Sequence, residues 1–135
     1  EGIGVHIVRE LMARFNDKYP YIDFIEAGTG SISVIHAISG RKKAVLIDCA
    51  RMGEKPGTIK RFIPEDVISK KQISGLSVHE NDVMTALALA RKLGEYPEQV
   101  VIFGIDPEKV ERGESLSMVL QEHFKYYIQV ITTEL

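Results

Sequence analysis

Two side chains could bind a metal or take part in hydrolysis, and the pattern around each indicates where it lies in the fold. The first is Asp48. It directly follows the unbroken apolar run at residues 44–47. An aspartate at the end of a buried strand has a fixed backbone, so it loses little conformational entropy when it takes a ligand. The pattern favours a functional Asp48, and a helix-capping or turn-closing aspartate is the alternative interpretation.

The second such side chain is His79, in the Ser-Val-His-Glu segment at residues 77–80. This segment fits a capping box, in which the Ser77 hydroxyl accepts from the amide of Glu80 and the Glu80 carboxylate accepts from the amide of Ser77. His79 would then lie in the first turn of a helix. The helix dipole disfavours imidazolium there, and a neutral imidazole is what a divalent metal needs. A surface or hydrogen-bonded histidine is the usual alternative, which we assign to the remaining histidines: His6, His36 and His123.

Glu1, Asp48 and His79 together would supply two carboxylates and one imidazole, with coordination positions left for water or substrate groups. Such a donor set accepts nickel, zinc or iron with limited discrimination. The spacing of the three residues is too irregular for a metal motif, and no H-E-x-x-H or paired C-x-x-C pattern is present. The residues alone therefore leave the metal open.

The elements that must position these residues follow from the apolar pattern. Helices are expected at residues 4–16, 31–38, 80–93 and 116–129, and strands at residues 21–26, 44–47, 58–63 and 100–103. The unbroken run at 44–47 is typical of a strand buried on both faces, which we expect at the centre of the sheet, whereas 58–63 indicates an edge strand. This alternation predicts an α/β fold, a three-layer α/β/α sandwich around a mostly parallel sheet, in one domain of residues 1–135.

Ligands of open α/β sheets bind beyond the carboxyl ends of the strands. Asp48, the turn at residues 27–30 and the segment at residues 104–106 each follow a predicted strand. A helix starting at Gly4 would ordinarily follow a strand too, so we expect a native N-terminal strand ahead of Glu1 that this chain lacks. Glu1 would then join the same rim.

Composition narrows the range of functions. The 135 residues carry 17 Lys plus Arg against 19 Asp plus Glu, without a continuous basic stripe, so nucleic acid is not an expected partner. No run approaches the roughly 20 apolar residues of a membrane span, so membrane insertion is not expected. The single cysteine, Cys49, cannot form an internal disulfide, which favours a reducing, cytoplasmic setting.

Other catalytic arrangements are weaker. There is no G-x-S-x-G elbow for a serine hydrolase. Strand alternation points Cys49 away from Asp48, which favours packing over nucleophilic attack. Gly2 and Gly4 could start a dinucleotide fingerprint, but Ile7 stands where the third glycine is needed. The loop at residues 52–58 is equally compatible with a plain surface loop and with a substrate contact.

Several segments, in order along almost the whole chain, resemble those of the hydrogenase maturation endopeptidases. The opening at residues 1–5 resembles the acidic-acidic-glycine-x-glycine segment of that family, with Glu1 at the metal-contacting acid. Residues 27–30 are similar to its Gly-Gly-Thr turn, with Ala27 in place of the first glycine. The remaining matches are the aspartate segment at 47–50 with its Pro-Gly-Thr sequel at 56–58, the histidine segment at 77–80 and the Gly-x-x-Pro segment at 101–107.

The resemblance implies an endopeptidase that removes the C-terminal extension of the large-subunit precursor of a nickel-iron hydrogenase. Nickel would arrive with this partner, held by precursor cysteines, and Glu1, Asp48 and His79 would recognise it. Asp48 would be catalytic, either as a general base or beside a water polarised by nickel. The expected substrate-contacting residues are Gly28, Thr29 and Gly57. A non-catalytic metal-binding assembly chaperone and a Rossmann-like nucleotide-binding domain are the alternatives.

Overall fold

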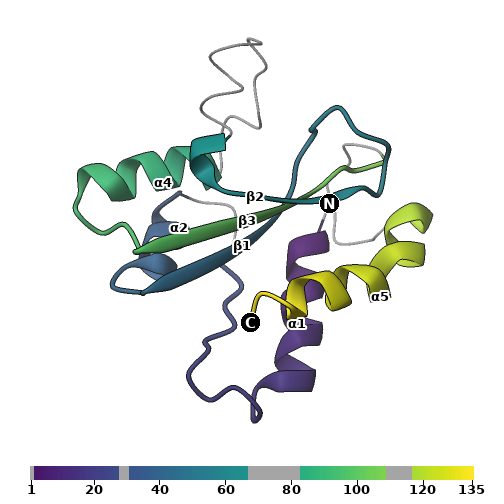
Figure 1. Cartoon of the computed structure of the whole chain (residues 1–135), viewed down its shortest axis with the longest axis horizontal. Coiled ribbons are helices and arrows are strands. Elements are labelled where there is room, and N and C mark those ends of the chain that lie inside the picture. The colour runs from purple at the N-terminus through teal and green to yellow at the C-terminus, as the bar shows by residue number, and fades with distance from the viewer. Residues whose placement is uncertain (1, 28–30, 67–82, 109–116) are drawn as a thin grey trace.

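The computed structural model describes residues 2–27, 31–66, 83–108 and 117–135 (Figure 1). Each predicted helix is present in this part, and so are the predicted strands at residues 44–47, 58–63 and 100–103. The elements in chain order are α1 (Ile3–Phe15), α2 (Ser31–Ile38), β1 (Lys43–Cys49), β2 (Ile59–Phe62), α4 (Val83–Lys92), β3 (Gln99–Ile105) and α5 (Met118–Thr132).

The described strands form one mixed sheet in the order β1-β3-β2 (Figure 1). β1 and β3 are parallel and pair from Lys43 with Gln99 to Cys49 with Ile105, whereas β2 runs antiparallel to β3. The strand at 44–47 was expected at the centre, but β3 holds that position in the described sheet. Burial follows the same order, because every residue of β3 after Gln99 is buried and β1 is mostly half-buried.

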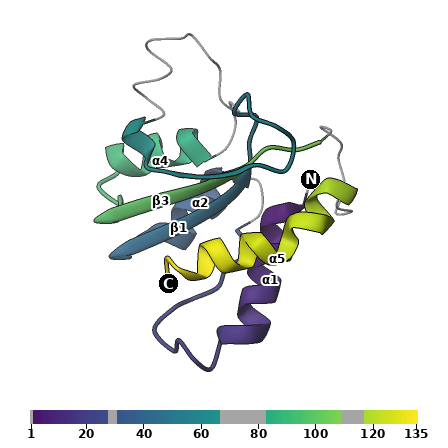
Figure 2. The ribbon, with the colours of Figure 1, turned by 45° about the vertical axis from the view of Figure 1, so that its right-hand side comes forward.

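Helices cover both faces of the sheet, which confirms the three-layer α/β/α fold (Figure 2). α1 and α5 pack on one face, here called the α1–α5 face, and α2 and α4 pack on the other, the α2–α4 face. Strand alternation divides the side chains of β1 between them. Val45, Ile47 and Cys49 contact the core on the α1–α5 face, whereas Ala44 and Leu46 belong to the core on the α2–α4 face.

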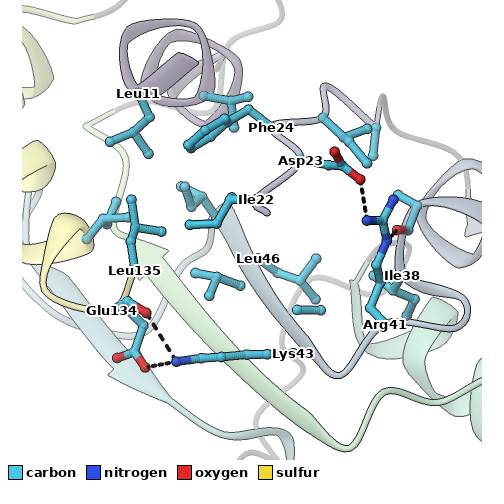
Figure 3. A pocket seen from close by; sticks show the side chains of 18 of the residues that line it. Leu11, Ile22, Asp23, Phe24, Ile38, Arg41, Lys43, Leu46, Glu134 and Leu135 are labelled. Atoms are coloured by element: carbon cyan, nitrogen blue, oxygen red, sulfur yellow. Dashed lines mark hydrogen bonds and ion pairs between the residues drawn. The ribbon is translucent and has the colours of Figure 1, made fainter. Parts of the chain in front are cut away.

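The strand predicted at residues 21–26 is absent, and residues 22–27 follow an irregular path. An apolar groove of about 580 Å³ separates this segment from the open edge of β1 (Figure 3). Phe24 and Leu46 line the groove, which also borders the ion pairs Arg41–Asp23 and Lys43–Glu134. Among the described residues, the segment therefore has no strand paired with it in a ladder. The strand expected ahead of Glu1 lies outside the sequence and stays a prediction.

Candidate functional site

Asp48 lies in the penultimate position of β1 and is half-buried. Its partner across the parallel ladder is Gly104 of β3. Because side chains alternate along a strand, and both Ile47 and Cys49 face α1 and α5, the Asp48 side chain belongs to the α2–α4 face. The structure thus places Asp48 at the carboxyl end of β1, which is the rim predicted for ligands.

Met52 covers the place where Gly104 has no side chain. A Cβ atom added to Gly104 would lie 2.8 Å from Met52 Sδ and 3.1 Å from Phe62 Cε1, both too close for an unshifted neighbour. Phe62 contacts the core on the α2–α4 face, so the Met52 thioether lies on the same face of the sheet as Asp48. Met52 therefore forms a wall beside Asp48, one strand away.

Asp106 fixes the Met52 loop, which we define as residues 51–58. Its side chain is buried, with 4% of its surface exposed, and it is the one buried charged residue in the described part of the chain. Asp106 Oδ1 accepts from the Met52 amide at 3.0 Å, and Oδ2 accepts from the Glu54 amide at 3.3 Å. The main chain closes the same loop, since the Gly57 amide donates to Asp106 O at 2.8 Å and the Asp106 amide donates to Thr58 O at 2.9 Å.

Gly57 anchors the Met52 loop to α5. It is buried and has φ +91°, a left-handed conformation that favours glycine. The Tyr127 hydroxyl donates to Gly57 O at 2.6 Å, and a Cβ atom on Gly57 would lie only 2.7 Å from Val119 Cγ1. These contacts describe a conformational role for Gly57, and the substrate contact expected of it stays a prediction.

Cys49 follows Asp48 but packs among the side chains of the α1–α5 face. The prediction that the two side chains point to opposite faces is thereby confirmed. A thiol on that face is separated from the Asp48 side chain by the sheet itself, so packing rather than nucleophilic attack accounts for its position.

The amino end of α1 meets the backbone of β1 next to Asp48. A Cβ atom on Gly4 would lie 2.7 Å from the carbonyl oxygen of Ile47. Only a glycine lets a helix approach a strand this closely. The first turn of α1 is therefore at the carboxyl end of β1, where Asp48 lies.

The remaining predicted site residues lie outside the described part of the chain: Glu1, Gly28, Thr29 and His79, with the capping-box residues Ser77 and Glu80. Within the part that is described, no three His, Cys, Asp or Glu side chains gather closely enough to hold a metal ion. Of the three predicted nickel-recognising residues, the structure positions Asp48.

A separate charged cluster lies away from this rim. Glu134, two residues after the end of α5, pairs with Lys43 of β1 at 2.8 Å and with Arg61 of β2 at 2.6 Å. The hydrogen bonds from Arg61 and then Lys43 lower the pKa of the Glu134 carboxyl to about 2 from its ordinary 4.5. Lys43 is the first residue of β1, so this cluster is at the opposite end of the strand from Asp48 and serves to fasten α5 to the sheet.

Residues 5–134 match the family model HycI, described as hydrogenase maturation protease. The chain belongs to the hydrogenase maturation protease family. It is 30% identical over 122 residues to the hydrogenase expression/formation protein HoxM of Cupriavidus necator, covering 90% of this chain and 60% of that protein. It is 26% identical over 113 residues to the hydrogenase 2 maturation protease of Escherichia coli, covering 82% and 67%. The chain thus spans about 60% of the length of the first curated relatives.

Solved structures of this family have the same fold. The hydrogenase maturating endopeptidase HybD from E. coli superimposes with a TM-score of 0.80 at 23% identity, covering all of this chain and 83% of that one. The [NiFe] hydrogenase maturation protease HybD from Thermococcus kodakarensis gives 0.67 at 19% identity, covering 98% and 87%. The family resemblance predicted from the sequence is confirmed.

None of the described helices is long and apolar enough to cross a membrane.

Asp106 and Met52 lie in segments that were considered from the sequence, residues 104–106 at the predicted rim and the loop at residues 52–58, but neither side chain was singled out. Asp106 carries a usable signal, because it follows the apolar strand β3 in the way that Asp48 follows residues 44–47. Met52 carries none, since its place depends on the path of the loop.

Proposed function

We propose that this chain is the core of a cytoplasmic endopeptidase that removes the C-terminal extension of a nickel-loaded hydrogenase large-subunit precursor. Glu1, Asp48 and His79 recognise the nickel that the precursor brings. Family membership supports the proteolytic class, and the name of the E. coli relative, hydrogenase 2 maturation protease, supports a hydrogenase as the substrate.

The close approach of Gly4 to the Ile47 carbonyl carries the proposal. Glu1 stands three residues before Gly4 in the sequence, and Asp48 follows Ile47 directly. Three residues of chain reach at most about 10 Å even when extended. The approach therefore supports a position for the Glu1 carboxylate within reach of an ion bound by Asp48.

The direction of α4 supports the part proposed for His79. α4 packs with α2 on the face that holds the Asp48 side chain, and it ends shortly before β3 begins (Figure 1). Val83 therefore lies toward the carboxyl ends of β1 and β3. His79 precedes Val83 by four residues in the sequence, which favours an imidazole near the same rim.

In this proposal Asp48 has two possible tasks in peptide hydrolysis. As a general base it would take a proton from the attacking water. As a nickel contact it would hold the precursor so that its metal polarises the water or the scissile carbonyl. Both tasks need the carboxylate at a fixed place, which the ladder of β1 with β3 supplies.

The test is incubation of the chain with purified precursor, with and without nickel, followed by intact-mass measurement. We expect the precursor to lose a C-terminal segment only when it carries nickel, because the ligand set is completed only by the two proteins together. Binding of the loaded precursor without shortening would instead identify a non-catalytic assembly chaperone. Cleavage of nickel-free precursor at an equal rate would contradict the recognition role.

A further inference from the structure

We propose that Asp106 is a positioning residue of the processing reaction, acting on the surroundings of Asp48 through Met52. This inference rests on the proposed protease function. It adds to that function a residue that is neither a metal ligand nor a group in contact with the reacting atoms.

The first step is the hydrogen bond that the Asp106 carboxylate accepts from the Met52 amide. A buried carboxylate is costly unless its oxygens are hydrogen-bonded, and here both are used by amides of one loop. Bonds from amides to a charged acceptor are stronger than neutral ones. The backbone of Met52 is therefore fixed to the carboxyl end of β3.

The second step runs from the Met52 backbone to its side chain. With its amide held by Asp106, Met52 places its thioether over Gly104, at the distance where a Cβ on Gly104 would collide with Sδ. Gly104 is the ladder partner of Asp48. The wall beside Asp48 is thus made by a flexible side chain whose backbone depends on one carboxylate.

Methionine by itself specifies position poorly, because three rotatable bonds let it adapt to irregular space. A methionine side chain beside a reacting carboxylate can meet the substrate in one fixed place only if its backbone is held. A misplacement of about 1 Å can lower the rate of a reaction about 100-fold. Asp106 meets this need because its carboxylate holds the Met52 amide. Its main-chain bonds with Gly57 and Thr58 hold the far end of the same loop.

The test is a double-mutant cycle on nickel-loaded precursor, with Asp106→Ala, Met52→Ala and the pair. Each single change should lower kcat by about tenfold while KM changes by less than about twofold, because a positioning group acts on the chemical step. The double variant should be no slower than the slower single variant, since both changes remove the same wall. Hydrogen exchange at the Met52 and Glu54 amides should accelerate in Asp106→Ala.

Ile131→Val is the matched control for stability. Ile131 is a residue of α5 that is fully buried in the core of the α1–α5 face, and its truncation costs about 1 kcal/mol. None of the hydrogen bonds that hold the Met52 loop involves its side chain. This variant should cleave at the wild-type rate. Wild-type kcat in Asp106→Ala, or additive losses in the double variant, would overturn the positioning role while leaving the protease proposal standing. Absence of cleavage by the wild-type protein would overturn both.

Discussion

Gly104 lies opposite Asp48 in the parallel ladder of β1 and β3, and its lack of a side chain gives Met52 its place. The strand ladder fixes Asp48 from one side, and the Met52 loop bounds it from another. The rim is therefore built by a sheet register and a carboxylate-held loop, which meet at Gly104.

Gly104→Ala should displace Met52. The new methyl group would lie 2.8 Å from Met52 Sδ and 3.1 Å from Phe62 Cε1, so Met52 must shift. Because the methionine side chain is flexible, the free energy of unfolding should fall by about 1 kcal/mol, the low end for overpacked sites. Urea unfolding measures this loss. In a Met52→Ala background the same change should cost less, because the colliding atom is gone. An equal cost in both backgrounds would show that Met52 is not the obstacle.

Tyr127→Phe should loosen the far end of the Met52 loop. Tyr127 is fully buried and donates to Gly57 O at 2.6 Å, so loss of the hydroxyl should lower the free energy of unfolding by about 1–2 kcal/mol. Tyr126→Phe is the control, since Tyr126 is 55% exposed. Chemical denaturation should separate the two variants, and equal stabilities would contradict the anchoring role of the hydroxyl.

Glu134 should make part of the stability depend on pH. Its folded-state pKa of about 2 lies below the ordinary 4.5, so its ion pairs stabilise the protein fully above about pH 4.5 and are lost as the pH falls toward 2. Glu134→Gln should cost about 1 kcal/mol at pH 7, and its difference from wild type should shrink below pH 4.5. Urea unfolding at pH 7 and pH 3 checks this, with the exposed Glu122→Gln as control. A pH-independent difference would exclude the ion pairs as the cause.

Cys49→Ala should leave peptide cleavage intact. Cys49 packs on the face opposite to Asp48, so its removal should cost about 1 kcal/mol of stability and no catalytic rate. Cleavage of loaded precursor, followed by gel shift or mass, tests this. A loss of turnover with the fold preserved would restore the thiol as a candidate nucleophile.

The fold was largely predictable where local pattern and tertiary packing agree. Residues 31–38 form α2 with the predicted bounds, and the apolar run at 100–103 lies inside β3. The prediction for residues 21–26 was wrong because a strand needs a partner at its edge, and the groove beside β1 separates the two. The central position expected of residues 44–47 was wrong because an unbroken apolar run indicates burial and does not give the order of the strands in the sheet.

The position of Asp48 at the rim was predictable, because a carboxylate at the end of a buried strand lies at the rim of any parallel sheet. Its role in the reaction stays a prediction. The clamp from Asp106 to Met52 was not predictable, because it joins residues 54 positions apart through the path of an irregular loop. Asp106 and Asp48 look alike in the sequence. They differ only in three dimensions. The Asp106 carboxylate accepts hydrogen bonds from two amides, whereas the Asp48 side chain lies on the α2–α4 face.

The most direct measurement is the single-turnover rate at which Asp48→Asn cleaves nickel-loaded precursor, followed by intact mass. The account predicts that the full-length precursor persists, with the variant nearly as stable as wild type, and that His79→Ala behaves in the same way. Asp17→Asn, which changes an exposed carboxyl group just after α1, should cleave at the wild-type rate. Cleavage by Asp48→Asn at the rate of Asp17→Asn would contradict the assignment of the site.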